Sequence, residues 1–151
     1  MSSVWMIYQF NIENRYSDCY KEIENLGYEF DTLNGFDNPN CKVKNPIKLY
    51  STTTTKLSGP VILNCKFAKR FGDWLEELNT TEISHVGGYN CRKIAGSWLM
   101  SQHSYGNAID ITYIDGVKIS ENWKEPAKLA CKHFNNVLTP ETNKAHEHHL
   151  H

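Results

Sequence analysis

The chain has 151 residues, 40% of them hydrophobic, and a formal net charge of −1 at neutral pH. This length is enough for one domain with a buried core and short for two. The near-neutral charge leaves no electrostatic footprint for nucleic acid or for an anionic membrane surface, so we expect neither as a partner.

Two features bear on the compartment. No apolar run approaches the ~18 residues of a transmembrane helix, and the apolar residues 4–8 lack the basic residues that precede the core of a signal peptide. Five cysteines without C-x-x-C or zinc-ribbon spacing suit disulfides in an oxidising compartment. We therefore expect a periplasmic or secreted protein whose targeting segment has been removed. The alternative is a cytosolic protein with free thiols.

The first part of the chain predicts an arm, a short helix and a long loop. Residues 1–16 carry alternating apolar side chains and are predicted as an arm or edge strand before a single domain over 17–151. Ser17 is expected to cap a helix over 18–26 that Gly27 ends. Turn-forming residues predict a loop over 31–46, followed by a short strand at 47–50. The Gly59-Pro60 pair predicts that regular secondary structure is interrupted at this point.

The second part predicts two further helices and a hairpin. Asn64 is expected to cap the clearest helix, because apolar residues from Phe67 to Leu78 follow the stripe of an amphipathic helix. A strand is predicted at 82–86, and residues 108–113 should pair with 117–119 across Asp115-Gly116. Another helix is predicted from Pro126 to about 137, and then a final strand. Segregated strands and helices predict an α+β fold, with a small, mainly antiparallel sheet flanked by two or three helices.

Two polar clusters stand out against this background. His103 lies in a polar loop, whereas Asp110 lies inside an apolar run, and a buried carboxylate needs an ionic, hydrogen-bonding or metal partner. Near the end of the sequence, His149 and His151 are two residues apart and would share one face of a strand, with Leu150 facing the core. Two imidazoles and one carboxylate with an open fourth position are the ligand set of catalytic zinc sites. We expect this site in a cleft on the sheet.

The same residues resemble known zinc motifs. Ser101-x-His103-x-x-Gly106-x-Ala108-x-Asp110 resembles the first motif of D-alanyl-D-alanine carboxypeptidases, and His149-x-His151 resembles the second motif of lysostaphin-type and penicillin-insensitive murein endopeptidases. From about Cys19 onward the chain resembles more narrowly the bacterial extensin-like C-terminal domain. The motifs that carry this resemblance are Cys41-x-Val43-x-x-Pro46, Cys65 opening a helix that reaches Trp74, Gly88-Tyr-x-Cys91-Arg92, and Ala130-Cys131-x-x-Phe134-x-x-Val137-Leu138-x-Pro140.

The resemblance implies a zinc peptidase that acts on peptides of bacterial peptidoglycan through a metal-activated water. We expect a monomer, although the sequence does not reveal the oligomeric state. The zinc ligands it implies are His103, Asp110 and His151. The residues assigned to substrate binding are Arg92, whose fork-shaped guanidinium suits a carboxylate, together with Tyr89 and Ser101. Gly106 is expected to supply a backbone conformation that a side chain would forbid.

One position departs from the relatives. They often carry an acidic general base three residues before the last ligand, where this chain has His148. Glu147 is adjacent but would point to the opposite face of a strand. We therefore assign the general base to His149 and the stabilisation of the tetrahedral intermediate to His146.

The resemblance also implies two disulfides. Four of the five cysteine positions recur in the resembling domains, which implies the pairs Cys41–Cys65 and Cys91–Cys131 and leaves Cys19 unpaired. Connectivity does not follow from a single sequence.

Three other interpretations remain open. A non-catalytic, zinc-stabilised domain that binds cell wall or protein would have a fourth protein ligand in place of water. A polysaccharide-active enzyme lacks support, since no paired carboxylates stand out. The terminal histidines resemble a purification tag, but Glu147 and Leu150 interrupt the run.

Overall fold

The computed structural model describes residues 17–33 and 38–151. The predicted arm over 1–16 and part of the predicted loop, residues 34–37, lie outside the described residues. No helix able to cross a bilayer is found in the described ranges, since each helix there is too short or too polar.

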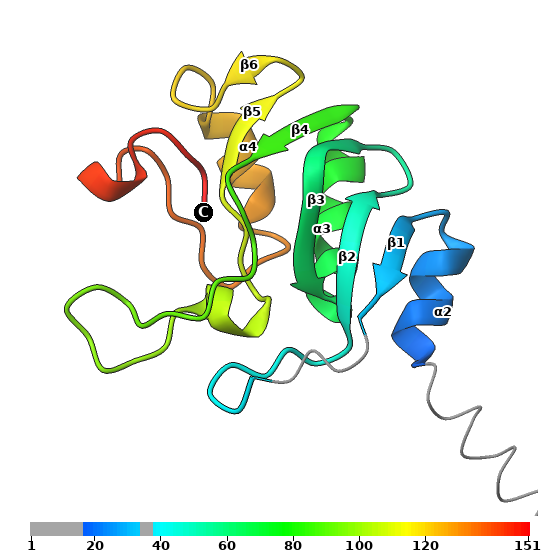
Figure 1. Ribbon diagram of the computed structural model, residues 1–151. Coiled ribbons are helices and arrows are strands. Elements are labelled where there is room, and N and C mark those ends of the chain that lie inside the picture. Colours follow the sequence, from blue (N-terminus) through cyan, green and yellow to red (C-terminus); the bar gives the residue numbers. More distant parts are fainter. Residues whose placement is uncertain (1–16, 34–37) are drawn as a thin grey trace, which may run out of the picture.

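Within this part of the chain, six strands form one sheet in sequence order (Figure 1). The strands are β1 (Glu29–Thr32), β2 (Pro46–Ser51), β3 (Lys56–Asn64), β4 (Glu82–His85), β5 (Ile111–Ile114) and β6 (Val117–Lys118). Neighbouring strands are antiparallel except β3 and β4, which are parallel. The predicted α+β class and mainly antiparallel sheet are confirmed.

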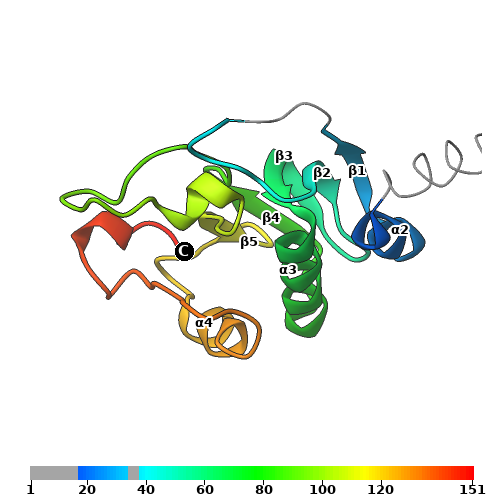
Figure 2. The ribbon, with the colours of Figure 1, turned by 90° about the horizontal axis from the view of Figure 1, so that it is seen from below.

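In the described ranges, three α-helices accompany the sheet: α2 (Asp18–Asn25), α3 (Cys65–Leu78) and α4 (Lys124–Ala130). Both predicted caps are present, because Ser17 Oγ accepts the N–H of Tyr20 and Asn64 Oδ1 accepts the N–H of Phe67. Figure 2 shows α3 and α4 on the same side of the sheet. The indole Nε1 of Trp74 in α3 joins them by donating to the Pro126 carbonyl, 3.1 Å away.

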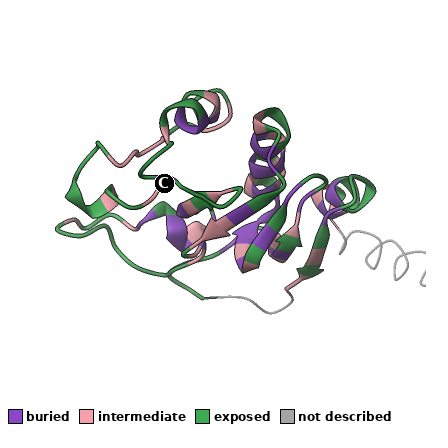
Figure 3. Ribbon diagram, turned by 90° about the horizontal axis from the view of Figure 1, so that it is seen from above, coloured by how far each residue is buried: buried purple, intermediate pink, exposed green. Residues whose placement is uncertain are grey.

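The core lies between α3 and the inward face of the central strands, where Figure 3 shows the buried residues gathered. The apolar stripe of α3 supplies Phe71, Trp74 and Leu75, each at most 2% exposed, and β2 supplies Ile47 and Leu49. Fully burying an aliphatic or aromatic side chain of this size contributes about 1.5–3 kcal/mol. The predicted amphipathic helix is therefore the main core element, as its periodicity indicated.

The predicted hairpin is also present. Asp115 and Gly116 have positive φ values of 49° and 79°, as a type I′ turn requires, and they connect β5 to β6. The strand begins at Ile111 and not at residue 108, so Asp110 immediately precedes it.

Four sequence predictions are wrong in detail. Gly59-Pro60 does not break the chain but lies inside β3, and residues 29–32, partly assigned to the loop, form β1. Helix α4 begins at Lys124 and ends at Ala130, about seven residues before the predicted end. The final strand is absent: residues 144–146 form a 3₁₀ turn, η2 (Lys144–His146), and Leu150 makes an isolated bridge with Ile111.

Candidate metal centre

A short 3₁₀ turn, η1 (Gln102–Tyr105), places His103. Ser101 caps this turn by accepting the N–H of His103, and Gly106 ends it with a φ of 69°. A Cβ at position 106 would lie 2.6 Å from the backbone nitrogen of Asn64. Both the positive φ and the close contact exclude a side chain, so the predicted role of Gly106 is confirmed.

The ring of His103 has a fixed orientation. Its Nδ1 lies 2.6 Å from the Gly88 carbonyl oxygen, and the residue is 2% exposed. A carbonyl oxygen only accepts, so Nδ1 carries the proton and Nε2 keeps its lone pair for a metal ion. Backbone carbonyls commonly orient metal-binding histidines in this way. A Cβ on Gly88 would lie 2.8 Å from the Ile62 carbonyl oxygen, so glycine lets this segment approach β3.

Asp110 is held by the backbone that precedes β5. Its carbonyl accepts the N–H of Val86 and its N–H donates to the Gly87 carbonyl, which joins it to the end of β4. One carboxylate oxygen lies 3.3 Å from His103 Nε2 and the other 2.9 Å from His151 Nδ1. Burial would raise the pKa of Asp110, but the two histidine partners outweigh burial and hold that pKa below its usual range. The carboxylate is therefore ionised at neutral pH.

The last residues of the sequence bring His151 to this carboxylate. Leu150 exchanges two backbone hydrogen bonds with Ile111, and His151 exchanges two with Leu138, at 2.8–2.9 Å. Leu150 is 4% exposed, as expected for a core residue. The predicted strand was expected to place His149 and His151 on one face. The bridge achieves this without a strand, because both histidines lie near Asp110.

The three predicted ligand side chains meet in one place. His103 Nε2 lies 3.2 Å from His151 Nδ1, and the Asp110 oxygens lie 2.9–3.3 Å from these nitrogens. Four ligands at ~2.0 Å around a tetrahedral ion are separated by roughly 3.3 Å, so the 3.2 Å between the two imidazole nitrogens fits a small divalent cation. One ligand atom from each of the three residues lies within 4.8 Å of the others. Among the described residues, the ligand group that converges here contains these three side chains and not His149.

Two more histidines border the centre. His149 Nε2 lies 3.6 Å from Asp110 Oδ1, and the His146 ring centroid lies 4.9 Å from that of His149 and 5.7 Å from that of His151. Burial is the main cause that lowers the pKa of both His149 and His146, so both imidazoles are neutral at neutral pH. His148 is exposed and lies 3.0 Å from Glu147, its neighbour in the sequence.

The residues assigned to substrate binding are more scattered. Ser101 is 5% exposed and its hydroxyl caps η1, so it has little surface to offer a substrate. Tyr89 is half-buried beside Gly88, and its N–H donates to the Ile62 carbonyl. Arg92 is exposed, and its backbone bonds to Ser101 and Ser104.

The predicted cysteine pairing is wrong, although the number of disulfides is right for the described residues. The bonds are Cys19–Cys65 and Cys41–Cys91, and Cys131 is free and exposed. A disulfide requires Cα atoms about 4.4–6.8 Å apart, and the two pairs are 6.2 and 5.7 Å apart. Packing of α2 against α3 brings Cys19 to Cys65, whereas Cys131 lies just after α4 and faces outward.

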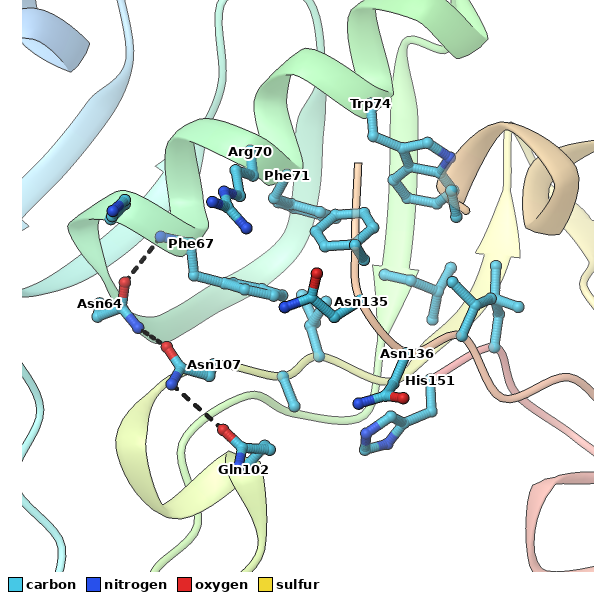
Figure 4. Close-up of a pocket in the computed structure, with 18 residues that line it drawn as sticks. Asn64, Phe67, Arg70, Phe71, Trp74, Gln102, Asn107, Asn135, Asn136 and His151 are labelled. Carbon is cyan, nitrogen blue, oxygen red and sulfur yellow. Dashed lines mark hydrogen bonds between the residues drawn. The ribbon is translucent and has the colours of Figure 1, made fainter. Parts of the chain in front are cut away.

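A cavity of about 440 Å³ adjoins the centre and shares His151 with it (Figure 4). One wall is the face of α3 that carries Phe67, Arg70 and Phe71. Neither Arg70 nor Lys66, which also lines this cavity, was among the predicted site residues. A signal was present: Arg70 interrupts the otherwise apolar stripe of α3 at the i+3 position from Phe67.

The comparisons with known proteins agree with part of the sequence interpretation. The searches of curated proteins and of solved structures returned no match. The family model described as "Extensin-like protein C-terminus" matches residues 17–151. This match includes all the metal-ligand candidates and both disulfides. The chain belongs to the extensin-like C-terminal domain family.

Proposed function

We propose that this chain is a zinc-dependent peptidase of bacterial peptidoglycan, related to the D-alanyl-D-alanine carboxypeptidases. The observation that carries the proposal is the convergence of His103, Asp110 and His151, whose ligand atoms all lie within 4.8 Å of one another. These residues come from segments up to 48 positions apart in the sequence. The half-buried carboxylate of Asp110 faces two imidazoles, which is an arrangement that a bound cation would stabilise.

The donor set favours zinc. Two imidazole nitrogens and one carboxylate oxygen form a borderline ligand field that suits Zn²⁺, whereas Ca²⁺ and Mg²⁺ prefer oxygen ligands alone. Three protein ligands with a fourth position for water are typical of catalytic zinc sites. When bound, the ion would lower the pKa of that water toward ~7 and polarise the carbonyl of the scissile peptide bond.

His149 is the best placed general base. Its neutral imidazole can take a proton, and its Nε2 lies 3.6 Å from Asp110 Oδ1, beside the three residues that would hold the metal ion. The carboxylate of Glu147 is paired with His148, which supports assigning this role to an imidazole.

His146 has a more restricted role. Its Nδ1 lies 2.6 Å from Asn143 Oδ1, which accepts, so a neutral His146 has its proton on Nδ1 and a lone pair on Nε2. In this tautomer Nε2 stabilises a developing negative charge only after it has taken up a proton. We therefore propose that His146 acts after His149 in the proton path, or through its protonated form.

The proposed location is the periplasm or the extracellular space. Two disulfides support an oxidising compartment, where peptidoglycan is also found.

A second candidate function is a zinc-stabilised domain that binds cell wall without cutting it. The observation in its favour is the position where relatives carry an acidic base, since His148 there is exposed and points away to Glu147. The same histidine and aspartate ligands would then serve only to hold the fold.

A digest of purified peptidoglycan separates the two candidates. Zinc-loaded protein should release peptides with new termini, detected by mass spectrometry, and chelation should abolish their release. Asp110→Ala should lose stoichiometric zinc together with activity. A fully zinc-loaded protein that cleaves neither peptidoglycan nor cross-linked muropeptides would exclude the peptidase and favour the binding domain.

A further inference from the structure

The cavity beside the metal centre carries a charge pattern that the fold does not use. Its eighteen lining residues include Lys66 and Arg70 but no aspartate or glutamate. Both cations are exposed, and neither has a carboxylate within 4.0 Å among the described residues. By contrast, Lys69 on the same helix pairs with Glu22 and Asp73. Lys66 and Arg70 also border a second cavity whose lining includes Asp18, Glu22 and Asp73, but they form no ion pair with these carboxylates. The two cations are therefore available to an anionic ligand.

The position of Lys66 also favours an anionic ligand in this cavity. Lys66 lies in the first turn of α3, which has no acidic residue there. The helix dipole disfavours a cation and favours an anion at this end. Lys66 therefore adds positive charge at an end of the helix that already favours an anion.

The wall between the cations and the metal centre is apolar. Phe67, Phe71 and Trp74 project from α3 toward the cavity, and the Phe134 ring closes it at 5.4 Å from Phe67 and 6.2 Å from Trp74. Figure 4 shows Arg70 projecting from the same side of α3 as Phe67 and Phe71, toward Asn135. A ligand with an apolar body and a single anionic group fits this arrangement.

One end of the cavity is lined with amides. Asn64 donates to Asn107, which in turn donates to Gln102 at 3.3 Å. On the opposite side, Asn135 and Asn136 lie at the cavity with His151 (Figure 4). Side-chain amides both donate and accept, so they suit the peptide groups of a ligand.

We propose that this cavity binds a peptide residue that has an apolar side chain and a free carboxylate, with the carboxylate held by Arg70 and Lys66. The assignment of the ligand as a peptide rests on the proposed peptidase function. Arg70 rather than Arg92 would then recognise the substrate carboxylate, because Arg92 does not line the cavity. The guanidinium fork binds a carboxylate through two parallel hydrogen bonds.

The test measures binding without cleavage. Nα-acetyl-leucine and its carboxamide, each in both D and L forms, would be titrated by ligand-observed NMR into zinc-loaded and into chelated protein. The acid of at least one form should bind about ten-fold more tightly than its amide, a difference of about 1.4 kcal/mol that suits one charge-assisted interaction. The preference should persist after chelation, so failure of the zinc assignment would not obscure the result.

Three variants locate the interaction. Arg70→Gln should reduce the affinity for the acid to that for the amide. Phe67→Ala should weaken both ligands together, since Phe67 supplies apolar wall and no charge. Lys128→Gln makes the same charge change at an exposed position of α4 outside the cavity and should leave both affinities unchanged.

Several results would overturn the proposal. Equal affinity for acid and amide would show that the cavity does not recognise a carboxylate. An Arg70→Gln variant that still prefers the acid as strongly as the wild type would show that Arg70 does not bind the carboxylate. Loss of the acid preference in Arg92→Gln but not in Arg70→Gln would move the clamp to Arg92. Displacement of the acid by an equal concentration of inorganic phosphate would identify a phosphate site instead.

Discussion

At the residue scale, the centre depends on the proton positions of its histidines. The Gly88 carbonyl fixes the proton of His103 on Nδ1, and the ionised Asp110 faces both ligand nitrogens. His149 and His146 are kept neutral by burial, which lowers the pKa of both. The site is thus arranged as two neutral bases beside one fixed negative charge.

His149 and His151 should differ on mutation, although they are two residues apart. His151→Ala should lose zinc and activity together, because Nδ1 is one of the three converging ligand atoms. His149→Ala should retain zinc and fold but lose on the order of 10²-fold in rate, the usual scale for a positioned acid or base. Zinc content by mass spectrometry and turnover of a muropeptide would test this. A His149→Ala protein as active as the wild type would remove His149 from the mechanism.

The metal-free protein should become less stable as the pH falls from about 7 to 5. Its His146 and His149 have lowered pKa values, so below the ordinary histidine pKa of ~6.5 the unfolded chain binds more protons than the folded chain. Their stabilising contribution is present above that value and is lost as the pH falls through it. The contribution of Asp110, whose pKa is also lowered, is lost only below its unfolded value of ~3.9.

Urea unfolding of chelated protein at several pH values would measure this decline. The double variant His146→Gln, His149→Gln should flatten it over the same interval. If the free energy of unfolding falls with pH as steeply in the double variant as in the wild type, groups other than His146 and His149 cause the pH dependence.

At the element scale, the supports of the ligands matter as much as the ligands. Gly106 ends η1 between β3 and β5, and the segment around Gly88 packs against β3. The Cys41–Cys91 disulfide holds that segment three residues beyond Gly88. The loop that carries His103 is therefore anchored on both sides.

Gly106→Ala should destabilise the fold by more than Gly96→Ala. Both glycines have positive φ, 69° and 73°, so both variants incur backbone strain of about 1–3 kcal/mol. A Cβ at 106 also meets the Asn64 backbone at 2.6 Å, whereas one at 96 meets nothing within 4 Å. Thermal unfolding would measure the loss of stability in each variant. Gly96→Ala reports backbone strain alone, whereas Gly106→Ala reports strain together with a steric clash, so equal losses of stability would contradict the packing described for Gly106.

The two disulfides should have different effects on metal binding. Each closes a loop of about 50 residues, and in the loop-entropy model each contributes about 4 kcal/mol to stability. Replacing Cys41 and Cys91 by serine should lower both stability and zinc affinity, because the carbonyl that orients His103 lies in the released segment. Replacing Cys19 and Cys65 should lower stability alone. Competition with a chromophoric chelator measures the affinities, and equal affinity in both double variants would exclude the anchoring role.

Local patterns predicted the elements that local chemistry determines. Asn64 before an apolar stripe and Asp115-Gly116 between two short strands each specify their element within a few residues. The prediction that Gly59-Pro60 interrupts the strand was wrong, because it assumed that every residue of a strand pairs regularly with its neighbours. The β2–β3 register passes from Ser51↔Lys56 to Leu49↔Val61, and β4 pairs only with Lys56 and Leu57, so both residues lie in a bulge that needs no ladder hydrogen bond.

Long-range contacts were harder to predict. The motif spacing predicted which three side chains converge, but no spacing rule reveals that Cys19 meets Cys65 through helix packing. Likewise, His151 reaches Asp110 through backbone bonds to Leu138 and Ile111, a bridge too short to show periodicity. The cavity is a property of several elements, and the sequence showed only the arginine in the stripe of α3.

At the scale of the whole molecule, covalent cross-links hold only one part of the chain. The disulfides connect residues between 19 and 91, whereas residues 101–151 contain no disulfide. That second part includes β5, β6, α4 and the segment that leads to His151. It is attached to the rest by non-covalent contacts, which include the pairing of β4 with β5, the packing of α4 on α3, and the hydrogen bonds that join η1 and Gly106 to Gly88 and Asn64.

If His103, Asp110 and His151 bind a metal ion as proposed, they would also form a removable cross-link. An ion between His103, Asp110 and His151 would close two loops, of 7 and 41 residues, within the part that lacks disulfides. Chelation should increase amide hydrogen exchange in α4 and residues 137–151 and leave β2 and β3 protected, as mass spectrometry of peptic fragments would show. Uniform exchange across both parts would contradict this division. Metal supply would then set the protease resistance of one half of the protein, while the redox state of the compartment sets that of the other.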